Sequence, residues 1–198
     1  MSKPGFRSRV AHRGAVCAAA LALPVALAAC SGGSGATAGD VLTTSQAPCP
    51  RITILADGAD LTQYLPGSVP DLTTMVLDAR ISGFDAVCDY ASRNRRELDV
   101  RVTPRFQVER GPAARGGSLE MPWFIALSDA ADTDVLERNV YVARATPASN
   151  QTRVNTTGQA ARLRLPIGDG VSAANYVVRI SFQLTPDQLA QNRRRGPR

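Results

Sequence analysis

Apolar and polar residues alternate along two segments of the chain. From Leu98 to Val108 every second residue is apolar or proline, and polar residues, most of them charged, occupy the positions between. The segment from Tyr176 to Leu184 repeats this pattern. Because successive side chains of a β-strand point to opposite faces, each segment predicts a strand with one buried and one exposed face. Pro104 has no amide hydrogen for the ladder, so it predicts a bulge or a sheet edge within the first strand.

Shorter segments that are rich in apolar residues indicate further strands. Turn-forming pieces such as 92–95, 111–117 and 168–170 separate them. The additional predicted strands are 51–56, 74–84, 86–90, 119–128, 135–144 and 160–166. Together these segments predict one all-β domain over residues 49–190, an immunoglobulin-like β-sandwich of about seven or eight antiparallel strands.

One short helix is predicted near the C-terminus. Thr185 is a suitable N-cap, Pro186 suits the first turn, and Asp187 complements the positive end of the helix dipole. Leu189 and Ala190 follow as apolar residues of the helix. We expect this helix to cap the sandwich.

The last residues of the chain are rich in arginine. We expect 191–198 to form a disordered tail. Arg193, Arg194 and Arg195 are candidates for contact with the phosphates of lipopolysaccharide or anionic lipid, because guanidinium groups pair with phosphate in a bidentate manner. The alternative is a frayed tail that only aids solubility.

The N-terminus has the pattern of an export signal. Four basic residues and no acidic residue lie within residues 1–13, and a short apolar stretch, 15–29, follows. A permanent membrane helix would need roughly 20 apolar residues, so the stretch is too short to span a bilayer. The sequence Leu27-Ala28-Ala29-Cys30 resembles the lipobox of bacterial lipoproteins, in which the cysteine receives diacylglycerol.

This resemblance implies a signal peptide over 1–29 and a lipid anchor on Cys30. The alternative is an ordinary signal peptide with Cys30 as a free thiol near the cleavage site. Residues 30–48 then form the lipidated cysteine and a flexible tether, since 31–39 consist only of Ser, Gly, Ala and Thr. Ser31, rather than aspartate, follows the cysteine, which in lipoproteins implies the outer membrane rather than the inner one.

Removal of the signal peptide changes the charge of the chain. The full sequence has 23 basic and 17 acidic residues. Without the four basic residues of the signal, 19 arginines face 17 acids, which leaves about +2. The remaining arginines are interspersed with acids outside the C-terminal run, so we do not expect the protein to bind nucleic acid.

The exported chain contains neither histidine nor lysine. His12 and Lys3 are the only residues of their types, and both lie in the signal peptide. This excludes Ser-His-Asp and Cys-His catalysis, histidine-ligated metal sites, Schiff-base lysines and phosphate-binding lysines. We therefore predict that the protein is not an enzyme and that it needs no cofactor.

Two cysteines remain in the exported domain. Cys17 is removed with the signal and Cys30 is lipidated, which leaves Cys49 and Cys88 in an oxidising compartment. We predict a structural disulfide between them, because a redox or metal-binding pair would be expected to have closer spacing or histidine partners. In the chain-entropy model, closing such a loop stabilises a fold by roughly 3 to 4 kcal/mol.

One aspartate-rich segment is a candidate calcium site. Asp129, Asp132 and Asp134 lie close together in the sequence, and calcium prefers several carboxylate and carbonyl ligands. The segment lacks the glycine and the bidentate glutamate of an EF-hand loop. A solvated hairpin turn is therefore the favoured interpretation.

A second group of carboxylates could serve glycoside hydrolysis, which needs two of them. Asp57, Asp60 and Asp71 lie near Tyr64 in the sequence. The favoured interpretation of 57–67 is a long loop between strands. For Trp123, the only tryptophan, a position in the core opposite the disulfide is favoured over an exposed binding platform.

Beyond the lipobox, the exported domain is similar to uncharacterised envelope lipoproteins of proteobacteria. The shared segments are Cys49-Pro50-Arg51, Ile54-Leu55-Ala56, Leu61-Thr62-Gln63-Tyr64-Leu65-Pro66-Gly67, Cys88-Asp89-Tyr90 and the ending from Phe182 to Leu189. The resemblance implies no activity. We predict a lipid-anchored envelope protein that acts as a structural or protein-interaction module with an envelope protein partner. The alternatives are a small-ligand or glycan-binding lipoprotein and, third, a carboxylate-based hydrolase.

Overall fold

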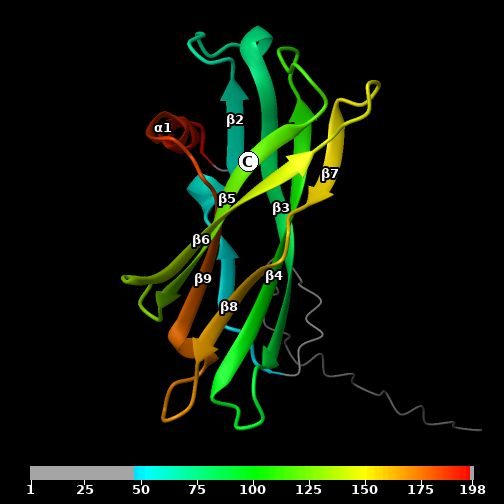
Figure 1. Cartoon of the computed structure of the whole chain (residues 1–198). Helices are drawn as coiled ribbons and strands as arrows, with labels where there is room; N and C mark the ends of the chain where they lie inside the picture. Colours follow the sequence, from blue (N-terminus) through cyan, green and yellow to red (C-terminus); the bar gives the residue numbers. More distant parts are fainter. Residues whose placement is uncertain (1–46, 197–198) are drawn as a thin grey trace, which may run out of the picture. The chain divides into compact units, whose positions relative to one another are not determined.

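A computed structural model describes residues 47–196, and this part of the chain forms nine strands in two sheets (Figure 1). One sheet has the strand order β1-β9-β5-β6 and the other has the order β2-β3-β4-β7, with β8 also pairing with β4. The predicted signal peptide, Cys30 and the predicted tether up to residue 46 lie outside the described residues. Between 47 and 196, no helix has the length and apolar character needed to cross a bilayer.

Residues 47–196 form nine strands, three single-turn helices that connect strands, and one α-helix that follows the last strand. The strands of the first sheet are β1 (Arg51–Ile54), β9 (Tyr176–Phe182), β5 (Leu119–Asp129) and β6 (Val135–Ala145). Those of the second sheet are β2 (Asp60–Tyr64), β3 (Met75–Tyr90), β4 (Glu97–Arg110), β7 (Arg153–Thr157) and β8 (Ala161–Pro166). The helices are η1 (Ala56–Gly58), η2 (Leu72–Thr74), η3 (Ala173–Asn175) and α1 (Pro186–Arg195).

The core lies between the two sheets, and the alternating strand β4 contributes one of its walls. The apolar residues of β4 that alternate with charged ones are fully buried, as the pattern predicts. The ring of Phe106 on β4 lies 6.1 Å from that of Trp123 on β5 and 5.6 Å from that of Phe182 on β9. Trp123 is therefore a core residue, as favoured above, and it joins the aromatic cluster between the sheets.

Pro104 lies within β4, which is a central strand. The bulge and the break in pairing that proline predicts occur in the strands that flank β4. The carbonyl oxygen of Pro104 accepts a hydrogen bond from the amide of Gly158, in the gap between β7 and β8. Since the amide and carbonyl of one strand residue point to the same side, the missing amide hydrogen also faces this gap. On the other side, the bulge lies in β3, between Ile81 and Gly83.

Four features of the strands differ from the sequence prediction. The two predicted strands 74–84 and 86–90 form one continuous strand, β3. β2 and β7 were not predicted, and β2 occupies part of the segment interpreted as a loop, because its backbone pairs with the long edge of β3. β1 pairs with β9 in parallel, so the sheets are not wholly antiparallel.

A disulfide joins Cys49 and Cys88, as predicted. Their Cα atoms lie 5.5 Å apart, and Cys88 is fully buried in β3. The amide of Ala47 donates a hydrogen bond to the carbonyl of Cys88, at 3.2 Å. The segment that precedes β1 is thus fixed to the second sheet, although β1 itself belongs to the first.

The C-terminal helix begins as predicted but extends further. Thr185 caps α1 by accepting a hydrogen bond from the amide of Gln188, and Pro186 is its first residue. The predicted disordered tail is wrong for residues 191–195, which form the second half of the helix. Buried Asn192 explains this, because its side-chain amide donates to the carbonyls of Asp57 and Asp60, at 2.8 Å each.

Candidate functional site

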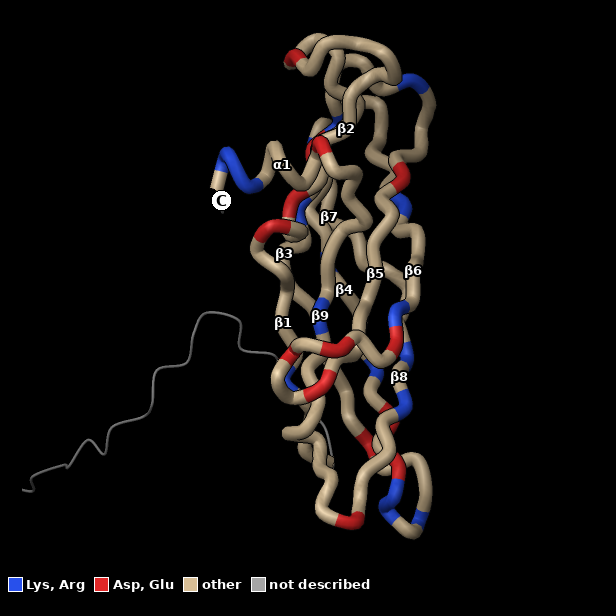
Figure 2. Tube along the Cα trace, turned by 90° about the vertical axis from the view of Figure 1, so that its left-hand side faces the viewer, with Lys and Arg blue, Asp and Glu red and all other residues tan. Residues whose placement is uncertain are grey.

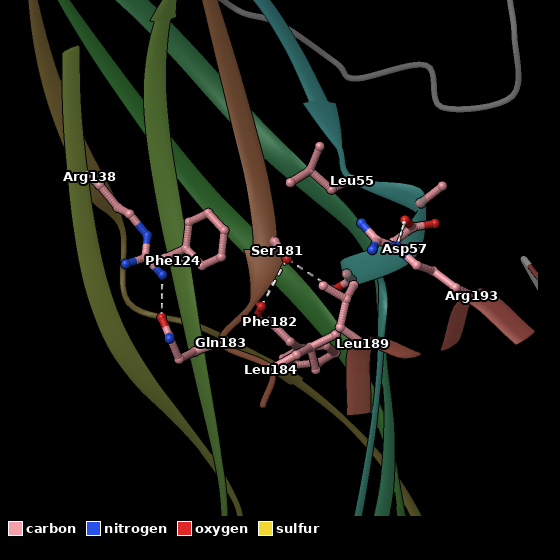
Figure 3. A pocket seen from close by; sticks show the side chains of 12 residues that line it. Leu55, Asp57, Phe124, Arg138, Ser181, Phe182, Gln183, Leu184, Leu189 and Arg193 are labelled. Carbon is pink, nitrogen blue, oxygen red and sulfur yellow. Dashed lines mark hydrogen bonds and ion pairs between the residues drawn. The ribbon is translucent and has the colours of Figure 1, made fainter. Parts of the chain in front are cut away.

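A groove lies on the outer face of the first sheet, between η1, α1 and the strands β5, β6 and β9 (Figure 3). Its volume is about 470 Å³, within the range of ligand sites in proteins. We call it the η1–α1 groove. It is lined by Leu55, Ala56, Asp57, Gly58, Phe124, Arg138, Ser181, Phe182, Gln183, Leu184, Leu189 and Arg193.

One wall of the groove is η1, which packs directly on β9. Ser181 is on the side of β9 that the alternating pattern assigns to solvent, yet it is only 4% exposed because η1 covers it. Its hydroxyl donates to the carbonyl of Phe182 at 2.9 Å and contacts that of Gly58 at 3.5 Å. A Cβ atom at position 58 would lie 1.8 Å from the Ser181 hydroxyl oxygen, so only glycine permits this close contact.

The opposite wall is α1, which two side-chain amides hold in place. Besides the two hydrogen bonds from Asn192, the side chain of Gln188 donates to the carbonyl of Thr62 at 3.2 Å. These bonds fix the helix against η1 and β2. As a result, Leu189 and Arg193 point into the groove (Figure 3).

The floor of the groove is apolar and partly open to solvent. Leu55, Phe124, Leu184 and Leu189 are all incompletely buried. A ligand that covers them removes apolar surface from water, which is favourable by about 25 cal/mol per Å². The floor therefore suits an apolar group rather than a sugar or a metal ion.

Arg138 is the cation at one side of the groove. Its guanidinium lies over the ring of Phe124, with the Cζ atom 4.2 Å from the ring centroid, and it donates a hydrogen bond to the side-chain oxygen of Gln183. No carboxylate among residues 47–196 forms an ion pair with it. On the other side, Arg193 pairs with Asp57 at 2.8 Å (Figure 3).

The four residues considered for hydrolysis are spread over η1, the two ends of β2 and the start of η2. Asp57 lies in η1 and Asp60 begins β2, where the two pair with Arg193 at 2.8 Å and Arg195 at 3.3 Å. Asp71 instead caps η2, and the hydrogen bond from the amide of Thr73 lowers its pKa. The hydroxyl of Tyr64 lies 3.4 Å from the side-chain nitrogen of Gln191. The groove receives only Asp57 from this set.

The candidate calcium segment forms the turn between β5 and β6. The carboxylate of Asp129 accepts hydrogen bonds from the amides of Asp134 and Thr133, which lower its pKa. Asp132 forms an ion pair with Arg179, and the hydrogen bonds from this arginine lower the pKa of Asp132. Within the described part of the chain, no group of three metal-binding side chains is assembled.

The three arginines considered for anion contact lie in the last turn of α1, where Figure 2 shows basic residues near the C-terminal end of the helix. Arg193 and Arg195 pair with Asp57 and Asp60. Arg194 is exposed and forms no ion pair with another residue of 47–196. Two of the three charges are therefore compensated within the protein, so the run is less available to an external anion than its sequence suggests.

A second pocket, of about 530 Å³, lies on the outer face of the second sheet. Polar residues predominate in its lining, and one of them, Arg105, pairs with Asp85 at 3.1 Å. The face around it carries further ion pairs, such as that between Arg153 and Glu109 at 2.8 Å. It has the character of a solvated sheet face, and the apolar floor of the η1–α1 groove makes the groove the better candidate site.

Sequence reasoning did not identify most of the groove residues. Phe124 and Arg138 lie on consecutive strands, and the register of β5 and β6 brings their side chains together. One signal was present on the strand that carries Arg138: β6 has Leu136, Val140 and Val142 at positions that an alternating strand would give to solvent, although none of the three lines the groove. Comparison with known proteins gives no further guide, since no protein-family model, no curated protein and no solved structure matches the chain.

Proposed function

We propose that this chain is an envelope lipoprotein, anchored through Cys30 to the outer membrane, which binds a small apolar or amphipathic ligand in the η1–α1 groove. The anchor rests on the lipobox-like sequence that ends at Cys30, and the membrane on Ser31. The observation that carries the binding function is the groove itself, an apolar floor of useful volume between two walls that side-chain hydrogen bonds hold in place. This supports the ligand-binding alternative more directly than the structural role.

The binding proposal predicts that filling the groove blocks an apolar probe. Ala56 is exposed in η1 and lines the groove, so Ala56→Trp places an indole in the ligand space. We expect the variant to bind the neutral dye Nile red about tenfold more weakly, a ratio that corresponds to about 1.4 kcal/mol. The measurement is a fluorescence titration of the full chain carrying Cys30→Ser, which leaves no lipid to compete.

The matched control is Ala174→Trp. Ala174 is also an exposed alanine in a single-turn helix, η3, but it does not line the groove. We expect this variant to bind Nile red like the parent. Equal binding by both variants and the parent would count against the groove as the site, whatever the affinity.

The anchor proposal predicts that Cys30→Ser releases the protein from membranes. A serine cannot form the thioether to diacylglycerol, so the apolar attachment is lost. Sedimentation of the envelope followed by immunoblotting checks this, with Cys17→Ser as the control that should stay in the membrane fraction. If Cys30→Ser sediments with the membranes as the unchanged protein does, the lipoprotein assignment is wrong.

A protein-interaction role is the second candidate, and the edge strand β6 favours it. Within residues 47–196, β6 pairs only with β5, and its outward residues Leu136, Val140 and Val142 are 56%, 52% and 43% exposed. Apolar edge strands invite the addition of a partner strand. In-cell crosslinking from a photoreactive residue at position 140 separates the candidates: a stoichiometric protein adduct supports this role, and its absence leaves ligand binding.

A further inference from the structure

We infer that the ligand of the η1–α1 groove is a long-chain monocarboxylate whose head group binds Arg138 and whose alkyl chain lies on the apolar floor. This inference rests on the proposed binding function of the groove and names the class of its ligand. Three features of the groove support it. Arg138 forms no ion pair within residues 47–196, its guanidinium is held in one position, and the apolar floor extends away from it.

The charge of Arg138 is not compensated by an ion pair within residues 47–196. Arg144 on β6, Arg179 on β9 and Arg193 on α1 each form an ion pair with a carboxylate. Arg138 contacts an aromatic ring and a neutral amide instead. One uncompensated positive charge matches a head group with one negative charge, whereas a phosphate monoester carries close to two.

The guanidinium of Arg138 is also held in one position. Phe124 supports its face, and Gln183 accepts one of its hydrogen bonds. The guanidinium of arginine has five donors in a planar fork that matches the geometry of a carboxylate. Because the ring and the amide already orient this fork, a carboxylate can pair with it at a small cost in side-chain entropy.

The floor continues from Arg138 in one direction. Phe124 lies next to the guanidinium, and Leu55, Leu184 and Leu189 lie farther from it, toward η1 and α1 (Figure 3). At that far side the charges of Asp57 and Arg193 compensate each other. The groove therefore offers one positive charge with an apolar surface beside it. This arrangement complements a fatty acid, which has one carboxylate and one alkyl chain.

The test is a titration of the full chain carrying Cys30→Ser with decanoate, dodecanoate and dodecan-1-ol, all below their aggregation limits, read by displacement of Nile red. We expect dodecanoate to bind about fourfold more tightly than decanoate, since each added methylene is about half buried in an open groove. We expect dodecanoate to bind about tenfold more tightly than dodecan-1-ol, because only the carboxylate makes charge-assisted hydrogen bonds.

Arg138→Gln should abolish the preference for the carboxylate and retain the binding of dodecan-1-ol. The matched control is Arg162→Gln, which removes the same charge from an exposed position on β8, in the other sheet, and should leave the preference intact. Loss of the preference in Arg162→Gln, with no loss in Arg138→Gln, would overturn the position of the head group.

The outcomes separate the inference from the proposed function. If dodecanoate and dodecan-1-ol displace the dye equally well, the groove binds apolar chains and the carboxylate inference is wrong. If neither displaces it and Ala56→Trp has no effect on the dye, the ligand-binding function itself fails. An unchanged carboxylate preference in Arg138→Gln, with circular dichroism equal to that of the parent, would also contradict the inference.

Discussion

Replacing Trp123 with alanine is expected to lower the free energy of unfolding by about 3–5 kcal/mol. Trp123 is fully buried, and its ring stacks on that of Tyr141 at a centroid distance of 4.8 Å while it packs against Phe106 from the opposite sheet. Alanine would leave a large cavity between the sheets, which surrounding strands can fill only in part. Urea unfolding followed by circular dichroism measures the loss, since the variant has no tryptophan for fluorescence.

Phe124→Ala is the matched control for this substitution. Phe124 is the next residue on β5, but it faces the groove and is only partly buried. We expect Phe124→Ala to lower the free energy of unfolding markedly less than Trp123→Ala, because removal of the ring leaves space that water already reaches. Similar losses for the two variants would mean that the core between the sheets does not dominate the stability of this domain.

The disulfide gives the second large effect. The double variant Cys49→Ala/Cys88→Ala is expected to lose about 3–4 kcal/mol of unfolding free energy, because the bond closes a loop with a sequence separation of 39 and so restricts the unfolded chain. Buried Cys88 also contributes packing in the core. The measurement is urea unfolding of the double variant and of its parent. Both carry Cys30→Ser, which removes the cysteine predicted to carry the lipid.

Reduction of the parent protein separates the crosslink from the packing. Reduced parent retains both sulfur atoms, so it should be destabilised by the crosslink contribution alone and should lie between the oxidised parent and the double variant. If the double variant and the oxidised parent unfold at the same urea concentration, the bond does not restrict the unfolded chain as proposed.

The strands that alternation predicts are all present in the structure, and the two missed strands, β2 and β7, lack that signal. β4 and β9 place large apolar residues at every second position, so their period alone identifies them. β7, with the sequence Arg-Val-Asn-Thr-Thr, has one large apolar residue and exists because β4 offers it a pairing edge. Pairing of this kind is a tertiary interaction, and no local pattern encodes it.

The groove depends on contacts of the same non-local kind. Its walls form because Gly58 approaches Ser181 and because Asn192 reaches the carbonyls of Asp57 and Asp60, contacts that join residues more than one hundred positions apart. The sequence indicates the helix cap at Thr185, but not the contacts that place α1 and η1 on either side of the groove. Composition is more informative about chemistry than about location, because residues 30–198 contain neither histidine nor lysine, two side chains that many catalytic mechanisms use.

The position of the disulfide has a mechanical consequence for the proposed anchored protein. A pull applied on the N-terminal side of the described domain would meet Cys49 before it meets β1. Cys49 cannot move away from Cys88 unless a covalent bond breaks, so the load passes into the long strand β3. The four residues of β1, held to β9 by a short parallel ladder, would therefore be shielded from such a pull.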